Sequence, residues 1–458
     1  MMKKSEEFDL VIRGGIIVHA HGLASGDIFI REGRIQKIGK EELSPSTRTI
    51  DASGKLILPG MIDAHLHPAY VDDFGSLSRS AAFGGVTTLI PFIRKEKGSN
   101  LIDTLKHFQE EGINKSFLDF GFHGELTSDD DVGSLIPECM KMGVTSFKMF
   151  MAYPKRGLMF CEDRLLPAME VLSGFGCLAM VHPENGFAID YLEKRAISRG
   201  EVSSAIFSKT RPNLLEAEAV YRAISLAKLT GCSLYLVHLS AKESMEPLRL
   251  LKDERVYAET CAQYLTLTDQ EMIRRGPLAK IAPPLRQRED MDALWSAVSE
   301  GLIDTIGSDH APYTPAMKAA PGENIFDAPF GAPGVETTLP VLYHEGVNQG
   351  KITPCRLVQI MSQGPAQIFG IYPRKGSIQI GSDADIVVFD PEYHWTIEAR
   401  NQHSNAGYTL FEGKKCMGRC TTVIQRGRVI IEDLELKARP GNARYLEGGL
   451  CKNEGRSR

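Results

Sequence analysis

The chain has 458 residues, of which 43% are hydrophobic and 24% charged, and its formal net charge is −5. These values are typical of a folded globular protein and exclude the disordered, collagen-like and coiled-coil classes. The charge is slightly negative and no run of Lys or Arg stands out, which argues against a nucleic acid or an anionic membrane as a partner. We therefore expect a small-molecule substrate.

Two sequence features indicate a cytoplasmic protein. The nine cysteines are scattered without CxxC spacing, as expected of reduced thiols. The N-terminal sequence MMKKSEEFDLVIRGG lacks the apolar stretch of a signal peptide, and no apolar run approaches the roughly 18 residues of a membrane span.

The first 58 residues alternate short β-rich runs with Gly-rich turns, which predicts strands joined by hairpins. The predicted strands are Phe8–Arg13, Ile16–Val18, Asp27–Arg31, Arg34–Ile38 and Thr47–Asp51. From residue 59 the pattern changes to short apolar runs, each followed by a stretch of helical period. Eight such units predict a (β/α)8 barrel.

The eight predicted barrel strands are Ile62–His65, Thr87–Pro91, Leu118–Phe122, Ser146–Met149, Leu178–His182, Leu234–His238, Tyr257–Thr260 and Asp304–Ile306. The clearest helical stretches are Leu101–Glu111, Asn213–Leu229, Glu243–Leu251 and Asp290–Glu300. Strand and hairpin patterns then return, at Ser377–Ile380, Ala384–Phe389, Trp395–Ile397 and Thr421–Ile431.

Because the two ends of the chain match in pattern, we predict that they build one small β-sandwich-like domain into which the barrel is inserted. The expected division is 1–58 and 376–436 for the β-domain, 59–375 for the barrel and 437–458 for a tail. This tail is polar and Gly-rich, so we expect it to stay mobile unless a partner subunit holds it.

Candidate metal ligands recur at the ends of the predicted barrel strands. His65 and His67 are two residues apart on a strand, so both imidazoles face one side, although such a pair can also be two ordinary histidines. His182, His238 and Asp309 each follow another strand at its C-terminal end, where barrel enzymes build their active sites. This convergence favours a centre of Zn²⁺ or another borderline divalent ion.

Four histidines exceed what one catalytic zinc uses, which indicates two metals. Two cations about 3.5–4 Å apart repel each other unless an anion bridges them. The strand between His67 and His182 offers no carboxylate but does offer Lys148. Lys148 would become an anionic bridge if its amine added CO₂ to form a carbamate; the alternative is a lysine that snorkels from the strand end.

The constellation resembles the hydantoinase and dihydropyrimidinase family of cyclic amidohydrolases almost from end to end. The motifs that carry the resemblance are Pro59-Gly-Met-Ile-Asp-Ala-His-Leu-His67, Phe147-Lys-Met-Phe-Met-Ala-Tyr153, His182-Pro-Glu-Asn-Gly186, Glu259-Thr-Cys-Ala-Gln-Tyr264, Pro283-Pro-Leu-Arg286 and Ser308-Asp-His310. The resemblance implies two Zn²⁺ ions, or other divalent metals, and a homotetramer or homodimer. It also implies a dinuclear hydrolase that opens a hydantoin or dihydropyrimidine ring to an N-carbamoyl amino acid.

The resemblance assigns roles residue by residue. It implies that His65, His67 and Asp309 hold one metal, that His182 and His238 hold the other, and that carboxylated Lys148 bridges both. Asp309 would also move the proton and Tyr153 would donate a hydrogen bond to the oxyanion, with Asp63 supporting the site from behind.

Other functions remain open at this point. An allantoinase, a dihydroorotase-like enzyme or a cyclic imide hydrolase would use the same centre. A non-catalytic scaffold relative should have lost several ligands, and this chain keeps all six. His123 and His310 lie near the site in sequence, and we expect structural roles for both.

Substrate choice is expected to depart from the family at two positions. Ala282 and Phe330 stand where the family usually has Ser and Asn, and position 69 is Ala, without the Arg that dihydroorotases carry there. A substrate with an essential ring carboxylate is therefore disfavoured. The loops after the first and fourth strands, with Phe330, supply mostly apolar side chains, which predicts an aromatic or alkyl substituent. These loop residues are Leu66, Tyr70, Phe150, Leu158, Met159 and Phe160.

Overall fold

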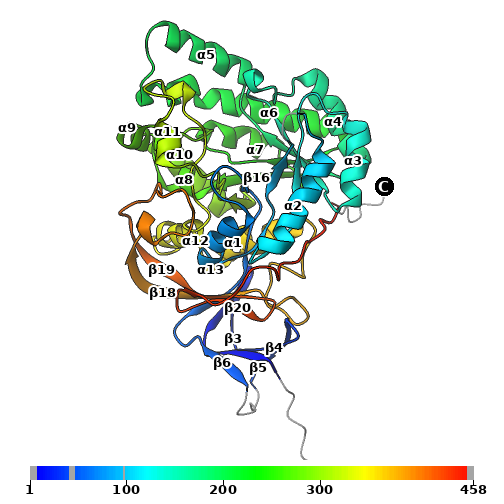
Figure 1. Ribbon diagram of the computed structural model, residues 1–458, viewed down its shortest axis with the longest axis vertical. Helices are drawn as coiled ribbons and strands as arrows, with labels where there is room; N and C mark the ends of the chain where they lie inside the picture. The colour runs from blue at the N-terminus through cyan, green and yellow to red at the C-terminus, as the bar shows by residue number, and fades with distance from the viewer. Residues whose placement is uncertain (1–7, 41–46, 96–97, 451–458) are drawn as a thin grey trace, which may run out of the picture.

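The computed structural model describes residues 8–40, 47–95 and 98–450. Parts of the predicted N-terminal segment (1–7 and 41–46) and of the predicted tail (451–458) lie outside these residues. Curled parallel strands surrounded by helices form the larger part of the molecule, and two further sheets, of seven and four strands, lie at one end of it (Figure 1).

All eight predicted strand positions are found in the barrel wall, which consists of a seven-stranded and a three-stranded parallel sheet. Its elements are β8 (Met61–Asp63), β9 (Val86–Leu89), β10 (Phe92–Arg94), β11 (Asp119–Phe120), β12 (His123–Glu125), β13 (Ser146–Phe150), β14 (Leu178–His182), β15 (Ser233–Leu236), β16 (Val256–Cys261) and β17 (Thr305–Gly307). Pro91, which lacks an amide hydrogen, lies between β9 and β10, so the second strand continues in two pieces.

The ends of the sheet meet just beyond the first and last strands. The amide of His67 donates to the carbonyl of His310 over 2.9 Å, and the amide of Asp309 donates to the carbonyl of His65 over 2.8 Å. These bonds join the extension of β17 to that of β8, so the predicted (β/α)8 barrel is confirmed. They also fix the candidate ligands His65, His67 and Asp309 side by side.

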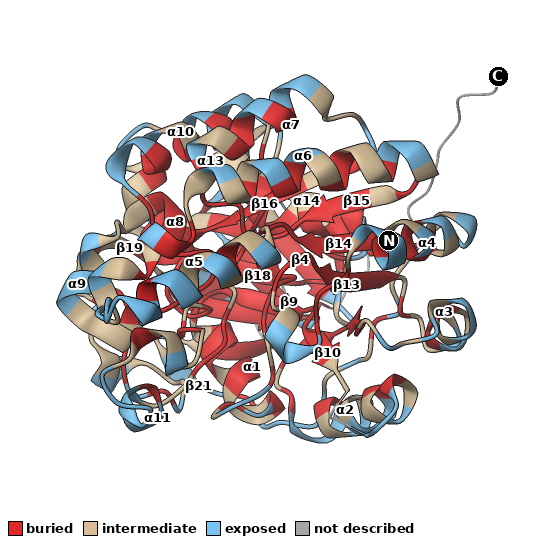
Figure 2. Ribbon diagram, turned by 90° about the horizontal axis from the view of Figure 1, so that it is seen from above, coloured by how far each residue is buried: buried red, intermediate tan, exposed pale blue. Residues whose placement is uncertain are grey.

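Helices cover the outside of the barrel and turn their polar faces to solvent, whereas the strands are buried (Figure 2). The longer helices are α1 (Phe74–Phe83), α2 (Leu101–Lys115), α3 (Val132–Lys141), α4 (Glu162–Gly174), α5 (Gly186–Ser198), α6 (Asn213–Thr230), α7 (Met245–Leu251) and α10 (Arg288–Glu300). The shorter ones are α8 (Ala262–Thr266), α9 (Gln270–Arg275), α11 (Pro315–Ala319), α12 (Thr338–Leu342), α13 (Pro354–Val358) and α14 (Gly364–Ile368). No helix in the described ranges has the length and apolar character needed to cross a bilayer.

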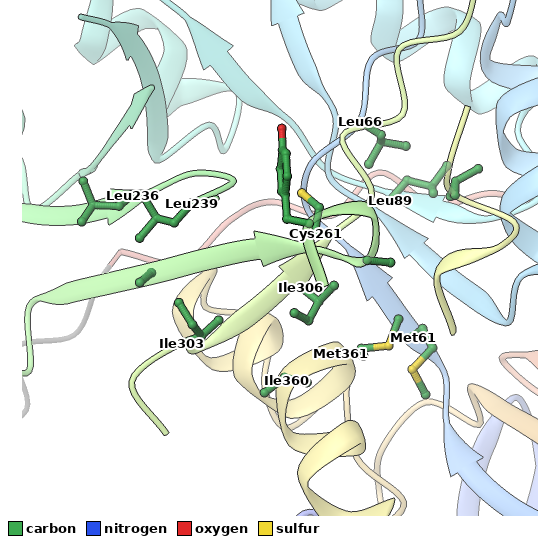
Figure 3. Close-up of a cluster of buried hydrophobic side chains, with 14 of the residues drawn as sticks. Met61, Leu66, Leu89, Leu236, Leu239, Cys261, Ile303, Ile306, Ile360 and Met361 are labelled. Carbon is green, nitrogen blue, oxygen red and sulfur yellow. The ribbon is translucent and has the colours of Figure 1, made fainter. Parts of the chain in front are cut away.

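Apolar side chains pack between the barrel strands and the helices around them. Met61, Leu89, Leu236 and Ile306, each from a different barrel strand, belong to one buried cluster (Figure 3). Leu66 belongs to the same cluster and is fully buried. Burying such side chains stabilises the fold by roughly 1.5–3 kcal/mol each, so this packing fixes the strands that carry the polar groups of the site.

Both ends of the chain contribute to one sheet beside the barrel. This sheet has the order β21-β20-β19-β18-β7-β2-β3, and a second sheet has the order β5-β4-β1-β6. The elements from the N-terminal part are β1 (Leu10–Arg13), β2 (Ile16–His19), β3 (Gly22–Ser25), β4 (Asp27–Arg31), β5 (Arg34–Gly39), β6 (Arg48–Asp51) and β7 (Leu56–Pro59). Those from the C-terminal part are β18 (Ile386–Thr396), β19 (Lys415–Gln425), β20 (Arg428–Glu432) and β21 (Glu435–Leu436).

Two strand predictions in the C-terminal part need correction. Residues 377–380 form no strand, and Ile380 is 66% exposed, so the alternating pattern there does not mark a buried sheet face. The predicted run Thr421–Ile431 is two strands, β19 and β20, because Arg426 and Gly427 have φ values of 45° and 69°. Positive φ at both central residues gives the tight turn that joins antiparallel strands.

The expected mobile tail packs against its own barrel over residues 437–450. The amide of Phe120 donates to the carbonyl of Arg444 over 3.0 Å, and the amide of Leu446 donates back to Phe120 over 2.7 Å. Leu446 is 4% exposed, and the Tyr445 hydroxyl donates to the carbonyl of Met142. The expectation of mobility is therefore wrong for this part, because its backbone and apolar side chains find partners within the chain.

Candidate active site

Six polar side chains meet at the C-terminal ends of the barrel strands. They come from β8 and its extension (His65 and His67), from β13 (Lys148), from β14 (His182), and from the segments directly after β15 and β17 (His238 and Asp309). All six are buried or nearly so: the most exposed are His67 and Asp309, whose side chains are 15% and 14% exposed. The parallel register brings together ligands that are spread between positions 65 and 309 of the chain.

The distances fall into two groups. His65 Nε2 and His67 Nε2 lie 3.2 Å and 3.5 Å from Asp309 Oδ1. On the other side, His182 Nδ1 lies 2.9 Å from His238 Nε2. The Lys148 Nζ atom is 3.2 Å from His65 Nε2. The arrangement therefore has a cluster of two histidines and a carboxylate, a separate pair of histidines, and an amine beside the first cluster.

Three residues close to the candidate ligands have left-handed backbone conformations. Tyr153, His238 and Asp309 have φ values of 66°, 43° and 49°. Such values are uncommon for residues other than glycine and cost of order 1–3 kcal/mol each, so the surrounding structure must hold them. Strain of this kind is concentrated at functional sites.

Two buried carboxylates orient the histidine rings from behind, and the sequence did not assign either of them a role. Glu259 Oε1 lies 2.6 Å from His65 Nδ1 and accepts the His238 amide over 2.9 Å. Glu184 Oε2 lies 2.8 Å from His182 Nε2 and accepts from Arg211 over 2.7 Å. Each carboxylate leaves the other ring nitrogen of its histidine facing the site, as is usual behind metal-bound histidines.

Asp63 holds the backbone on both sides of the site. Its Oδ1 accepts the amides of His65 over 3.1 Å and Ser308 over 3.2 Å. Burial raises the pKa of Asp63 to about 6. The carboxyl thus positions the two segments that carry His65 and Asp309 without facing them directly.

Burial also sets the protonation states of the central groups. It lowers the pKa of His67 to about 4, and it lowers the pKa of His182 and His238, which keeps these imidazoles neutral and able to bind a metal. Burial alone would raise the pKa of Asp309, but His65 and His67 hold it well below its usual range. Asp309 is therefore a carboxylate.

The pKa values of Lys148 and Tyr153 are shifted in the directions that the expected roles of these residues require. Burial lowers the pKa of the Lys148 amine, which increases its neutral fraction. Burial raises the pKa of the Tyr153 hydroxyl, which keeps it protonated and able to donate a hydrogen bond.

The donor set fits a divalent metal. One ligand atom each from His65, His67 and Asp309 lie within 4.8 Å of one another. His238 Nδ1 is a buried nitrogen with no hydrogen-bond partner among the described residues. Imidazoles and a carboxylate from different strands are the ligands that zinc and similar ions take in hydrolases.

A cavity of about 70 Å³ opens over these groups. Of the side chains predicted to contact substrate, Phe150, Tyr153, Ala282 and Phe330 line it. Leu66 lies in the buried core, and Met159 is 9% exposed and outside the lining. The lining also includes Arg94, Arg156, Tyr70 and Tyr313; of these, only Tyr70 was expected near the substrate.

The two remaining histidines near the site have structural contacts. His123 Nδ1 lies 2.5 Å from Ser146 Oγ, and its Nε2 lies 3.1 Å from the carbonyl of Ala64. His310 Nε2 lies 3.0 Å from Asp72 Oδ2. Neither ring lines the cavity.

Comparison with known proteins decides the family. The Amidohydrolase family pattern matches residues 225–430. The chain is 37% identical to the D-hydantoinase of Ralstonia pickettii over 96% of this chain and 98% of that protein, and 38% identical to the D-hydantoinase of Rhizobium radiobacter over 93% and 95%. The chain belongs to the hydantoinase and dihydropyrimidinase family.

A solved structure agrees with this assignment. The dihydropyrimidinase from Brevibacillus agri NCHU1002 superposes with a TM-score of 0.92 at 34% identity, covering 96% of this chain and 98% of that one. In a member of this amidohydrolase family, the His65, His67 and Asp309 cluster indicates a divalent metal centre.

Proposed function

We propose that this member of the hydantoinase family hydrolyses the ring amide of a five- or six-membered cyclic ureide, of the hydantoin or dihydropyrimidine type, to an N-carbamoyl amino acid. The observation that carries the proposal is the convergence of six candidate ligands below a cavity that Tyr153 also lines. Relatives named D-hydantoinase and D-phenylhydantoinase align with nearly the whole chain, which supports this reaction class.

The proposed centre holds two divalent ions, with zinc as the first candidate. His65, His67 and Asp309 would bind one ion, and His182 and His238 would bind the other. Lys148, carboxylated on its amine, would bridge them. Lys148 is only 2% exposed, which argues against a lysine that reaches out to solvent, and its lowered pKa favours the neutral amine that adds CO₂.

When bound, the two ions would supply Lewis-acid polarisation of the carbonyl and an activated water. Tyr153, kept protonated by burial, donates a hydrogen bond to the oxygen that becomes negative during attack. Asp309 accepts the proton of the attacking water and delivers it to the leaving ring nitrogen. That delivery is needed because an amide anion is a poor leaving group.

A substrate panel tests the proposal. Zinc-loaded protein is assayed with hydantoin, dihydrouracil, allantoin, dihydroorotate and succinimide, with Asp309→Asn as the control for contaminating activity. We expect the highest kcat/KM for hydantoin or dihydrouracil. A preference for allantoin, dihydroorotate or succinimide would assign the chain to one of the alternative ring-opening activities instead.

A non-catalytic scaffold is the remaining alternative, and the same assay addresses it. Retention of all six ligand residues argues against this role. Failure to open any ring, with two metals bound per chain, would favour it.

We also propose that the chain assembles into a homotetramer, or else a homodimer, and that it is located in the cytoplasm. Assembly is expected from the family, and the scattered cysteines and the N-terminal sequence support the location. Light scattering on the purified chain tests the assembly, and a monomer would contradict it.

A further inference from the structure

Two arginines on different elements line the cavity above the proposed metal centre. Arg94 ends β10, and Arg156 ends the short 3-10 helix η1 (Pro154–Arg156). The described lining contains one carboxylate, that of Asp309, which already lies against His65 and His67. Opening a neutral ring requires neither guanidinium, so their free N–H groups can contact another part of the substrate.

Arg94 is held in place at one edge. Its Nε donates to Glu125 Oε1, and Glu125 is fully buried on the neighbouring strand β12, directly opposite Arg94 in the register. The guanidinium also lies 5.7 Å from the centre of the Phe150 ring. A guanidinium has five N–H donors, and within the described residues the terminal nitrogens of Arg94 make no hydrogen bond, so a fixed fork remains for a ligand.

Arg156 presents a positive charge beside Tyr153. Its guanidinium lies 5.5 Å from the centre of the Tyr153 ring, and no carboxylate in the described part of the chain pairs with it. The adjacent Lys155, by contrast, pairs with Asp190 over 2.5 Å. A positive group beside Tyr153 would attract an anion to the substrate position.

Two tyrosines complete this side of the cavity. The rings of Tyr70 and Tyr313 stack with centres 4.2 Å apart, and both residues line the cavity. Their hydroxyls and the two guanidinium groups give this wall a set of donors. Such a set suits a planar carboxylate better than a purely apolar substituent.

We propose that Arg94 and Arg156 bind a carboxylate on the exocyclic substituent of the substrate, so that the preferred ring carries a short carboxyalkyl group. This inference specifies the substrate of the proposed function. It rests on that function only in assuming that the substrate is a cyclic ureide. It departs from the apolar substituent that the sequence predicted, because β10 and η1 bring in charges that the loop residues considered there do not have.

The test compares two isosteric rings that differ in charge: 5-carboxymethylhydantoin and its neutral amide, 5-carbamoylmethylhydantoin. We expect kcat/KM to favour the carboxylate in the wild type and this preference to fall about tenfold or more in Arg156→Gln, since a hydrogen bond to a charged group is worth that much. Arg94→Lys, which keeps the charge that pairs with Glu125 but loses the fork, should reduce the preference as well. Lys155→Gln is the matched control and should keep the wild-type preference.

Ring opening itself creates a carboxylate on the product. Kinetics distinguish binding of this new carboxylate from binding of the carboxylate on the substituent. If the arginines bind the newly formed carboxylate, Arg156→Gln will weaken product inhibition for every substituent and leave the charge preference in kcat/KM intact, which would overturn the proposal. Calorimetry with the Asp309→Asn variant, in which turnover should be very slow, should show the same charge preference in binding. Inactivity on every ring with charge-selective binding would overturn the proposed function and leave this inference standing, whereas equal binding of both compounds would overturn the inference.

Discussion

Two groups of residues surround the cavity and are positioned in different ways: the candidate metal ligands, which we call the floor, and the side chains above them, which we call the wall. The floor consists of residues at strand ends, where the hydrogen-bond register of a parallel sheet fixes each side chain beside its neighbours. The wall comes from β10, η1, and the segments that hold Tyr70, Tyr313 and Phe330. The floor therefore determines the reaction that is possible, and the wall determines which ring is accepted.

Among substitutions in the floor, replacement of Lys148 should cause the largest loss of activity. Lys148→Ala removes the proposed bridge, so repulsion between two cations is no longer offset and most of the bound metal should be lost. Activity should fall by about 10³-fold or more, and short carboxylic acids should restore part of it. Metal content by mass spectrometry and kcat/KM are the measurements.

Lys155→Ala serves as the control for the Lys148 experiment, since that side chain is half-exposed and pairs with Asp190. It should retain its metals and its turnover. A Lys148→Ala protein with two metals per chain and near-normal turnover would show that the amine is not a bridge.

The next effects concern the two groups assigned to proton transfer and to the oxyanion. Tyr153→Phe should lower kcat by about 10²–10³ with unchanged metal content, because it removes one donor. Asp309→Asn should lower kcat further, since it removes the proton carrier and weakens a ligand together. If Tyr153→Phe raised KM alone, its role would be in ground-state binding.

The floor was predictable because its signals are local. His182 and His238 end apolar runs of strand length, and a parallel barrel puts all such ends at one rim. Glu184 and Glu259 were visible within the recognised motifs, but their roles depend on which ring nitrogen they contact. A one-dimensional pattern does not contain that contact.

The wall was less predictable, because the direction in which a loop side chain points follows no repeating sequence pattern. Leu66 follows the first strand, as the pattern suggested, yet its side chain lies in the buried cluster that strands and helices share, away from the cavity. Arg94 sits two residues beyond Phe92 on a strand that Pro91 interrupts, and its approach to the cavity depends on pairing with Glu125. The packing of the tail was also not predictable from composition. The tail is mostly polar, and only a few of its residues, such as Tyr445 and Leu446, pack against the barrel.

Truncation tests whether the tail supports the barrel or an assembly. Deleting residues 443–458 removes Tyr445 and Leu446 and the backbone bonds to Phe120, so the unfolding midpoint should fall by several degrees. The oligomeric state and the activity of the remaining folded protein should be retained. The matched control deletes residues 451–458 alone and should leave the midpoint near that of the full chain.

Calorimetry and light scattering on the two truncations decide between these roles. An unchanged midpoint combined with dissociation of the oligomer would favour the role in assembly that the sequence suggested.

The smallest expected effect concerns two buried lysines that hold the segment carrying Phe330. Lys280 Nζ donates to the carbonyls of Phe326 and Ala328, and Lys318 Nζ donates to those of Lys280 and Pro329. Burial lowers the pKa of Lys280 to about 7 and that of Lys318 well below its usual value. In the unfolded chain both amines titrate near pH 10.4, about the ordinary value for lysine.

The sign of the pH effect follows from proton counting. Between about pH 7 and pH 10 the unfolded state binds the proton that folded Lys280 has released, so the free energy of unfolding should rise with pH across this window. Lys280→Met removes one titrating amine, so its unfolding midpoint should change less than that of the wild type between pH 7 and pH 9.5. Lys194→Met, at a lysine whose side chain is 64% exposed, is the control and should keep the wild-type pH dependence. Equal pH dependence in Lys280→Met and the wild type would mean that the amine stays charged in the fold, and that the wall at Phe330 is held by a buried cation on its neighbouring carbonyls.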